Sequence, residues 1–415
     1  MTRVGVMDIE ILRNIRDCNS TSRLTTDWRG DDLGQWRGVS CNADGHVTEL
    51  FLMESGLTQL PEGFGRLLKL EKLWLSQNAL RQLPADFGEL HSLQALWLSD
   101  TLFKEVSQQV LQLTNLQQLY INLSPITSLP AGIASLGNLH WLDLSESLLA
   151  SLPPEIGQLT NLRRLDLHSN KITHLPPEIG ALTLVTRLSL HSNELVYLPP
   201  EIGRLTALTW LSLNCNHLRT VPREMGRLTN LTRISLHINR LISLPEELGQ
   251  MTALESLAAF TNELPEISGR MLAGWHDMTR LCLWTNQITF LPAEIGCMQN
   301  LQELWLKENR LTSIPPEIGR CKLLKRMWLE SNLLETLPEE VGDCVALQEL
   351  YLDDNRLRSL PLSIASLPNL RKLFVGRNPQ LFLPHAFAHL TSDTMHQDLA
   401  ADFTMPAYSP MALSS

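Results

Sequence analysis

Apolar residues recur along this chain in one long pattern. The motif LxxLxLxxNxL, in which x is any residue, is followed fifteen times in succession. Each copy begins 23 residues after the previous one, except for a single step of 24 residues. Repetition at this period indicates a solenoid, in which each repeat buries its apolar face against its neighbours. The copies begin at Val47, Leu70, Leu93, Leu116, Leu139, Leu162, Val185, Leu208, Leu231, Leu254, Met278, Leu301, Leu324, Leu347 and Leu370.

Each part of the repeat predicts a structure. Leucines such as Leu165 and Leu167 alternate with one outward residue, which is the period of a strand buried on one face, and the strands are expected to stack in parallel. Segments of sequence LPPEIG, such as 152–157, carry the chain over the opposite side. Proline suits this position because it fixes φ and has no amide hydrogen that requires a hydrogen-bond acceptor. An asparagine falls where the chain turns inward, and its amide is suited to bond neighbouring turns as a ladder. These asparagines are Asn170, Asn193, Asn216, Asn239, Asn262, Asn286, Asn309, Asn332, Asn355 and Asn378.

Residues 47 to about 390 resemble the leucine-rich-repeat family. The resemblance implies an α/β solenoid, namely a curved horseshoe with a parallel concave sheet, short helical or irregular convex segments and about 15 repeats of 23 residues. We expect an N-terminal cap at 1–46, repeats over 47–380 and a C-terminal cap at 381–390. The segment 391–415 is rich in small, polar and proline residues and is expected to be disordered.

Two details relate the chain to branches of that family. The 23-residue spacing with LPPEIG resembles intracellular Ras-binding scaffold proteins and the plant intracellular Ras-group repeats, whereas plant cell-surface receptors typically use 24 residues with LxGxIP. Segment 36–41 (WRGVSC) follows an expected amphipathic helix over 9–15 and resembles the N-terminal cap of plant receptor-type repeats. That cap usually has a cysteine where this chain has Gly34, so Cys41 lacks the disulfide partner that the resemblance implies, and Cys18 is the alternative.

The step of 24 residues has a different convex sequence. After Asn262 the proline comes three residues earlier than in neighbouring repeats, at Pro265, and Gly269 and Gly274 follow. The convex turn is therefore expected to differ over 264–277. Three interpretations stay open, which are a tolerated insertion, a bend in the solenoid and a separate contact surface.

Composition and charge narrow the function classes. The chain is 44% apolar and 19% charged with a formal net charge of −10, which is typical of a soluble globular protein and argues against nucleic acid as a partner. No window reaches the roughly 18 uncharged apolar residues of a membrane-spanning helix. Charged residues interrupt any signal-peptide core near the N-terminus, and the seven cysteines form no CxxC or Cys-His metal motif. We therefore expect a cytoplasmic protein.

Because the repeats are in register, equivalent outward positions form columns along the predicted sheet, about 4.8 Å apart. The middle column has aromatic residues at both ends and small or acidic residues between them. Aromatic side chains favour strands and support one another across a ladder. These side chains, however, are expected to point away from the core as exposed apolar surface, and Trp and Tyr are enriched at binding hot spots. Both interpretations stay open for the column, which runs Phe51, Trp74, Trp97, Tyr120, Asp143, Asp166, Ser189, Ser212, Ser235, Ala258, Cys282, Trp305, Trp328, Tyr351 and Phe374.

The next column is rich in histidine at its centre, where His168, His191 and His237 occur near Asp166. No metal site is expected, because His237 is about 14 Å from His168 at the strand spacing, far beyond zinc's bonds of roughly 2 Å. Ser189 beside these histidines invites comparison with a hydrolytic triad. The amides of a continuous parallel ladder are already bonded, however, and leave no oxyanion hole. The sequence therefore predicts no catalytic residue, no metal and no cofactor.

The column before the strand core forms a partial basic stripe. One interpretation is a solvated edge neutralised by nearby acidic residues. The other is a surface that captures an acidic peptide or loop through forked guanidinium contacts. The stripe consists of Arg164, Arg187, Arg233, Arg280 and Arg326, and Trp210 and Ser256 interrupt it.

Together these columns predict a non-catalytic interaction scaffold or adaptor that binds a protein partner on the concave face in signal transduction. The family resemblance implies a small GTPase or a phosphatase subunit as the partner. The alternative is an extracellular or receptor-type sensor of peptide or glycan ligands, which the cap and the glycosylation triplets at Asn19, Asn122 and Asn230 favour. The expected contact residues are Trp74, Trp97, Tyr120, Asp143, Asp166, His168, Arg187, His191, Arg233, His237, Trp284, Trp305, Trp328 and Tyr351.

Overall fold

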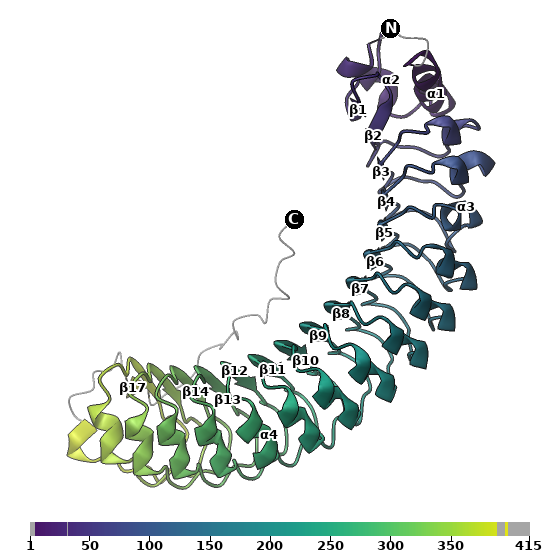
Figure 1. The fold of residues 1–415 in the computed structure, drawn as a ribbon. Coiled ribbons are helices and arrows are strands. Elements are labelled where there is room, and N and C mark those ends of the chain that lie inside the picture. The colour runs from purple at the N-terminus through teal and green to yellow at the C-terminus, as the bar shows by residue number, and fades with distance from the viewer. Residues whose placement is uncertain (1–4, 31, 388–394, 397–415) are drawn as a thin grey trace. The chain divides into compact units, whose positions relative to one another are not determined.

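A computed structural model describes residues 5–30, 32–387 and 395–396 of the chain. The chain divides into two compact units, Met1–Met278 and Thr279–Ser415, and each is described by itself. Within each unit the strands lie side by side on one face and the short helices lie on the opposite face (Figure 1). The predicted solenoid of 23-residue repeats with parallel strands is confirmed in each unit.

The first unit, among its described residues, forms strands β1 to β11. Strand β1 runs antiparallel to β2. From β2 onward each strand pairs in parallel with the next at the same repeat position, so that Leu165 lies beside Leu188. The strands are β1 Val39–Cys41, β2 Val47–Phe51, β3 Lys72–Trp74, β4 Ala95–Trp97, β5 Gln118–Tyr120, β6 Trp141–Asp143, β7 Arg164–Asp166, β8 Arg187–Ser189, β9 Trp210–Ser212, β10 Arg233–Ser235 and β11 Ser256–Ala258.

Short helices form the opposite face of this unit. Most are single 3-10 turns that follow a proline. Proline favours the start of such a turn because its φ is held near the helical value and it has no amide hydrogen to leave without an acceptor. A Cβ at Gly180 would lie 2.7 Å from the carbonyl oxygen of Glu201 in the next repeat, so glycine allows successive turns to pack this closely. The 3-10 helices are Leu33–Gln35, Phe64–Arg66, Ala85–Glu89, Ala131–Ser135, Pro154–Gln158, Pro177–Ala181, Pro200–Arg204, Arg223–Arg227 and Glu246–Gln250.

Two repeats of the first unit replace the 3-10 turn by a short α-helix. Helix α3 (Gln108–Leu111) occupies a repeat whose sequence lacks the LPPEIG pattern. Helix α4 (Gly269–Gly274) lies in the irregular segment 264–277. There Trp275 is fully buried and its Nε1 donates a hydrogen bond of 2.9 Å to the carbonyl oxygen of Leu248. The extra residue is therefore accommodated locally, by a short helix and by the tryptophan that directly follows it and fills the core.

The leucine core and the asparagine ladder agree with the sequence prediction. Leu165 and Leu167 are fully buried. The Nδ2 of Asn193 donates to the carbonyl oxygens of Leu190 at 3.1 Å and Leu167 at 2.9 Å, and its Oδ1 accepts from the amide of Ile172 at 3.0 Å. Two of these hydrogen bonds join Asn193 to the preceding repeat, and the third lies within its own repeat. Three successive repeats lack this asparagine and carry Thr101, Ser124 and Ser147 instead.

Each repeat also contains one residue with a positive φ, directly before the ladder position. The angle lies between 50° and 58° at all of these non-glycine positions, including 55° at Ser169 and 54° at Ile238. This left-handed conformation turns the chain inward so that the asparagine side chain enters the core. The residue types there show no glycine preference, so the sequence pattern did not reveal the turn.

The N-terminal cap contains helices α1 (Gly5–Cys18) and α2 (Leu24–Asp27). Helix α1 packs through buried Leu12 and Ile15, as expected for an amphipathic helix. The carboxylate of buried Asp8 accepts a hydrogen bond of 2.9 Å from the amide of Val47 and so joins the cap to the first repeat. Cys18 and Cys41 are both free thiols, so the alternative disulfide between them is absent.

The second unit continues the same repeat. Cys321 and Cys344 are fully buried where other repeats place leucine, and burial raises the pKa of both thiols to about 12. Its described strands are β12 Arg280–Cys282, β13 Glu303–Trp305, β14 Arg326–Trp328, β15 Glu349–Tyr351, β16 Lys372–Phe374 and β17 Met395–His396, and its 3-10 helices are Ala293–Cys297, Pro316–Arg320, Glu339–Asp343, Leu362–Ser366 and His385–Phe387.

Two further features concern the whole chain. No helix in the described part has the length and hydropathy of a membrane span. The predicted disordered segment 391–415 lies outside the described residues apart from β17, whose Met395 pairs with Leu373. The predicted C-terminal cap at 381–390 is described only as far as Phe387, which is buried.

Candidate functional site

The predicted contact residues lie on the sheet surface opposite the leucine core, which we call the strand face. At the beginning of the first unit this face carries an aromatic ladder. Phe51 contacts Trp74 with ring centroids 5.8 Å apart, Trp74 stacks on Trp97 at 4.5 Å, and Trp97 stacks on Tyr120 at 5.2 Å. Phe51 is 46% exposed, while the three rings after it are half-buried. In this part of the column the rings pack against one another, and each of them also remains partly exposed to solvent.

The ladder ends at a cluster around Asp166. Tyr120 meets Trp141 edge-on at 5.0 Å, and the guanidinium of Arg164 lies 4.0 Å above the Trp141 ring. Both Arg164 Nε, at 2.6 Å, and Trp141 Nε1, at 3.0 Å, donate hydrogen bonds to Oδ2 of Asp166. Asp166 is buried. Arg164 and Asp166 are therefore engaged with each other, and neither offers a free charge to a partner.

Asp143 lies one strand before Asp166 and is also largely held within the fold. Its Oδ1 accepts hydrogen bonds from the amide of Ser145 at 3.0 Å and from the Ser145 hydroxyl at 2.6 Å. Burial raises the pKa of Asp143 above its usual range, although the bonds from Ser145 oppose that rise. This carboxylate is a weaker attractant for a cation than its position in the sequence implied.

The histidine column divides into two stacked pairs. His168 and His191 are half-buried and stack with centroids 4.4 Å apart, whereas His237 is 9% exposed and stacks on Phe260 at 4.2 Å. Burial, together with a neighbouring histidine, lowers the pKa of His191 and of His237 to about 4. Both rings are therefore neutral at physiological pH. They form a polar surface without charge.

Arg187 differs from Arg164 and Arg326, the two arginines of the basic stripe that pair with carboxylates. Its guanidinium is exposed and lies 5.7 Å from the ring centroid of Trp210, and no described carboxylate lies within ion-pair distance of it. Arg326, in the second unit, bonds Glu303 at 3.0 Å and lies 3.7 Å from Glu349. The stripe is thus neutralised at Arg164 and Arg326, as one interpretation expected, and carries an available charge at Arg187. Arg233 lies half-buried two strands away, in β10.

The aromatic column of the second unit is not an exposed surface, so that expectation is wrong there. Trp305 and Trp328 lie 4.0 Å apart, Tyr351 follows at 5.5 Å and Phe374 at 4.7 Å. Trp305 is 9% exposed, Trp328 8% and Tyr351 5%. The rings cover one another, because each packs against the ring on the neighbouring strand. The last aromatic contact residue, Trp284, is half-buried.

One carboxyl group beside these rings is unusual. The Oε2 atom of Glu330 is buried and has no hydrogen-bond partner in the described part of the chain. Burial raises the pKa of Glu330 to about 7, with Asp353 and Glu308 adding to the rise and Lys307 opposing it. The Glu330 side chain therefore changes its charge near neutral pH.

The histidine column does not gather metal ligands in the described part of the chain. The described residues contain no group of three or more His, Cys, Asp or Glu side chains placed to hold an ion. His168 and His191 have nearly parallel rings, 8° apart. Parallel rings direct their nitrogen lone pairs side by side and not toward one point, so the pair is not arranged as a chelate.

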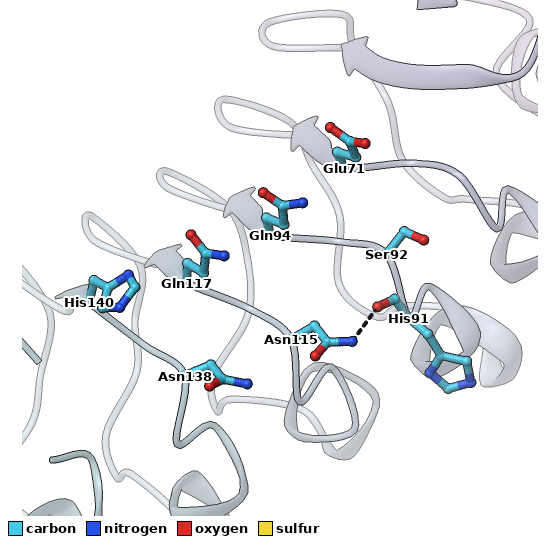
Figure 2. A pocket seen from close by; sticks show the side chains of 8 residues that line it. All are labelled: Glu71, His91, Ser92, Gln94, Asn115, Gln117, Asn138 and His140. Atoms are coloured by element: carbon cyan, nitrogen blue, oxygen red, sulfur yellow. Dashed lines mark hydrogen bonds between the residues drawn. The ribbon is translucent and has the colours of Figure 1, made fainter. Parts of the chain in front are cut away.

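A polar hollow of about 450 Å³, which we call the amide groove, lies along the amino ends of β3 to β6 (Figure 2). Each wall is a column of polar side chains from successive repeats. Sequence analysis did not single out these residues, although the run of amides directly before the strand core could have indicated them. The strand-side wall consists of Glu71, Gln94, Gln117 and His140, and the turn-side wall consists of His91, Ser92, Asn115 and Asn138.

Comparisons with known proteins agree with the repeat geometry. A family profile described as "Leucine rich repeat" matches residues 114–172, 137–195, 160–218, 183–241 and 299–357. A leucine-rich-repeat protein from Leptospira interrogans is 33% identical, with a TM-score of 0.72, over 81% of this chain and 95% of its own. The plant peptide hormone receptor RGFR1, solved in complex with RGF2, is 28% identical, with a TM-score of 0.65, over 88% of this chain and 72% of its own.

A third structure shows the fold alone. A leucine-rich-repeat protein from Bacteroides eggerthii is 14% identical, with a TM-score of 0.74, and the match covers 96% of both chains. A search of curated proteins found no match.

Proposed function

Because this chain belongs to the leucine-rich-repeat family, whose fold indicates a protein-protein interaction scaffold, we propose that it holds a protein partner on the strand face of its first unit. The binding surface is centred on β7 to β9, between the aromatic ladder and the His237–Phe260 stack. The proposal depends most on one observation, the exposed guanidinium of Arg187 over Trp210.

Arg187 defines the chemistry of the partner. A planar guanidinium without a carboxylate partner in the fold is suited to a forked contact with an acidic side chain. Trp210 adds a partly exposed ring at the same place, and rigid aromatic side chains are frequent anchors in interfaces. The partner segment is therefore acidic, although the chain as a whole carries a net charge of −10.

The floor of this surface allows close approach. Ser189 and Ser212 occupy the middle column there and are buried, so no bulky side chain stands between the sheet and the partner. His168 and His191 border the floor as polar rings, and the lowered pKa of His191 keeps that ring neutral. The imidazole nitrogens of these histidines can therefore hydrogen-bond the backbone of a partner, and the neutral His191 ring does not repel a positively charged group.

The same geometry favours a non-catalytic role. A hydrolytic site around Ser189 needs free amides to stabilise an oxyanion. The amide of Leu190, which follows Ser189, already donates a hydrogen bond of 2.8 Å to the carbonyl oxygen of Ser212. We therefore propose a scaffold or adaptor and not an enzyme.

The repeat spacing supports a more specific partner class. It resembles that of intracellular Ras-binding scaffold proteins, so a small GTPase or a phosphatase subunit in a cytoplasmic signalling pathway is the partner we propose to test first. The acidic segment required by Arg187 is the property that such a partner must have.

A second candidate function is a receptor-type sensor of peptide ligands. The 28% identity to a plant peptide hormone receptor favours it. Against it, the two cap cysteines are free, and Asn19 is buried with its amide bonded to the carbonyl oxygens of Ile15 and Gln59, so that triplet is not accessible for glycosylation. Asn230 is exposed. Glycosylation of Asn230 in the native protein would favour the sensor over the scaffold.

The proposal is tested by binding kinetics. A partner is first purified on the wild-type protein, and its association rate is then compared for wild type, Arg187→Glu and Arg204→Glu. Arg204 is an exposed arginine at the end of a 3-10 helix on the opposite face, so it matches the change in charge away from the proposed surface. We expect Arg187→Glu to slow association about tenfold at low salt and less at high salt.

Arg204→Glu should leave the rate unchanged. Equal rates for all three proteins, with normal thermal melts, would place the partner elsewhere and contradict the assignment. An equal slowing by both variants would show that net charge alone matters, and would contradict it as well.

A further inference from the structure

The amide groove is separate from the proposed partner surface. It lies beside β3 to β6, at the amino ends of the strands, whereas Arg187 begins β8. Its residues point outward from the segments that lead into the strands, and none of them belongs to the middle column. Any ligand bound there would not need to touch the Arg187 surface.

The groove has hydrogen-bonding capacity that the fold does not use. Among the described residues, the side chains of Gln94, Gln117 and His140 on the strand-side wall make no hydrogen bond, and they are exposed or half-buried. On the turn-side wall, Nδ2 of Asn115 donates to the carbonyl oxygen of His91 at 2.8 Å, the dashed contact in Figure 2, and leaves Oδ1 as an acceptor. The turn-side wall is therefore held in place by the hydrogen bond of Asn115, while the side chains of the strand-side wall are available to bond a ligand.

The groove also coincides with three successive repeats that depart from the consensus at the ladder position. Thr101, Ser124 and Ser147 replace the ladder asparagine in three successive repeats, and α3 replaces a 3-10 turn in one of them. These repeats give up stabilising hydrogen bonds that their neighbours keep. Departures from local sequence rules concentrate at functional sites, so this coincidence is a second observation that points to the groove.

We propose that the amide groove binds a neutral oligosaccharide. Its amides and imidazoles supply donors and acceptors, as the hydroxyl groups of a sugar chain do, and the hydroxyl of Ser92, which donates to the carbonyl oxygen of Leu68 at 2.7 Å, remains an acceptor. Glu71, at one end, is the single carboxylate in the lining, and no lining residue is a lysine or arginine, so the groove has no charge complement for a phosphate or a nucleic acid.

A peptide is a poorer fit to the same groove. No aliphatic residue lines it, so an apolar peptide anchor finds no pocket. An extended peptide repeats its side chains about every 6.8 Å on one face, whereas the rungs of the groove follow the strand spacing of about 4.8 Å. The side chains of such a peptide and the rungs of the groove therefore no longer coincide after two rungs.

The test uses a panel of neutral oligosaccharides of about six sugar units, namely cello-, chito-, manno- and maltohexaose, titrated into the full chain by calorimetry. The groove variant is Gln94→Ala with Gln117→Ala. The control variant is Gln302→Ala with Gln348→Ala, which removes two amides from the same repeat position in the second unit. We expect saturable binding of at least one sugar, weakened roughly tenfold in the groove variant and unchanged in the control.

A second measurement guards against an unfolded variant. The ring protons of His91 and His140, which line the groove, should shift on titration of the wild type in NMR spectra, while those of exposed His217 in a later repeat should not.

Absence of binding for every sugar overturns the proposal. Binding that persists in the folded groove variant, or shifts at His217 instead of the groove histidines, overturns it too. A neutral peptide that binds and perturbs only the groove histidines would replace the sugar by a peptide as the ligand. None of these outcomes depends on the Arg187 surface, so this test and the test of the scaffold proposal are independent.

Discussion

The imidazole rings of His168 and His191 stack across neighbouring strands with their centroids 4.4 Å apart and their planes 8° apart. The Nδ1 of each ring lies beside the hydroxyl of the following serine, at 3.3 Å for Ser169 and 3.2 Å for Ser192. Burial and the presence of His168 lower the pKa of His191 to about 4. Protonation of His191 would place a charge in this partly desolvated stack, so burial favours the neutral form of that ring.

Replacing His191 by glutamine should make folding less sensitive to mild acid. The folded pKa, about 4, lies below the ordinary 6.5 of the unfolded chain, so the neutral ring contributes stability above pH 6.5 that is lost as the pH falls toward 4. Between about pH 7 and pH 4.5 the wild type should lose about 1–2 kcal/mol more than the variant, allowing for partial exposure. Urea unfolding at both pH values measures this difference. His174→Gln, at an exposed site, is the control, and equal losses in wild type and His191→Gln would contradict the lowered pKa.

Replacing Glu330 by glutamine should stabilise the protein at alkaline pH. Burial raises the folded pKa of Glu330 from 4.5 to about 7, so the folded state binds the proton more tightly, and stability contributed by the protonated form is lost as the pH rises through 7. Thermal melts at about pH 5 should be nearly equal for wild type and Glu330→Gln, and at about pH 8.5 the variant should melt several degrees higher. A lower melting temperature for the variant at pH 8.5 would show that the ionised carboxylate has a favourable partner.

Replacing Trp328 by alanine should reduce stability before it affects any partner. The ring is 8% exposed between Trp305 and Tyr351, and its removal leaves a cavity in a stacked column. We expect a loss of about 3 kcal/mol in unfolding free energy. Phe382→Ala, at a site 74% exposed, should change it by less than about 0.5 kcal/mol. A normal melt for Trp328→Ala would restore the interpretation of this residue as an exposed anchor.

Replacing Ile238 by glycine should stabilise the fold. Ile238 has a φ of 54° and is 46% exposed, so a branched side chain is held in a left-handed conformation that costs it roughly 1–2 kcal/mol. Glycine adopts that conformation without a steric penalty, and part of the gain is lost to its greater entropy in the unfolded chain. The melting temperature should rise by a few degrees. The same change at Ile242, which is 52% exposed and has no positive φ, should lower it.

Replacing Asn193 by alanine should cost far more than replacing Ser147 at the equivalent position. The Asn193 side chain bonds four main-chain groups, two of them in the preceding repeat, and its loss leaves the buried amide of Ile172 without a partner. We expect a loss of about 2–4 kcal/mol for Asn193→Ala. Ser147 donates only to the carbonyl oxygen of Ser145 among the described residues, so Ser147→Ala should cost about 1 kcal/mol or less. Denaturant unfolding of both variants compares the two, and equal costs would contradict the ladder's role.

The repeat architecture could be predicted because its determinants are local and periodic. Leu167 is buried and Asn193 bonds its neighbours for the same reason, namely that each repeat places the same residue type at the same turn of the chain. Once a strand pairs in register with its neighbour, its inward-facing leucine can only point into the core. Positions such as Ile238 show the limit of this reasoning, since the left-handed turn is set by the backbone path and any residue type is tolerated there.

The sequence by itself thus determined the repeat length, the strands, the buried leucines and the column to which each outward residue belongs. Only the tertiary structure decided what those columns present to a partner. It buried Trp305 and Trp328 by packing each ring against the ring on the neighbouring strand, joined Arg164 to Asp166, and left Arg187 exposed. A column gives the order of side chains about 4.8 Å apart, but whether a side chain stands out or lies on the next rung depends on its rotamer and on the residue beside it.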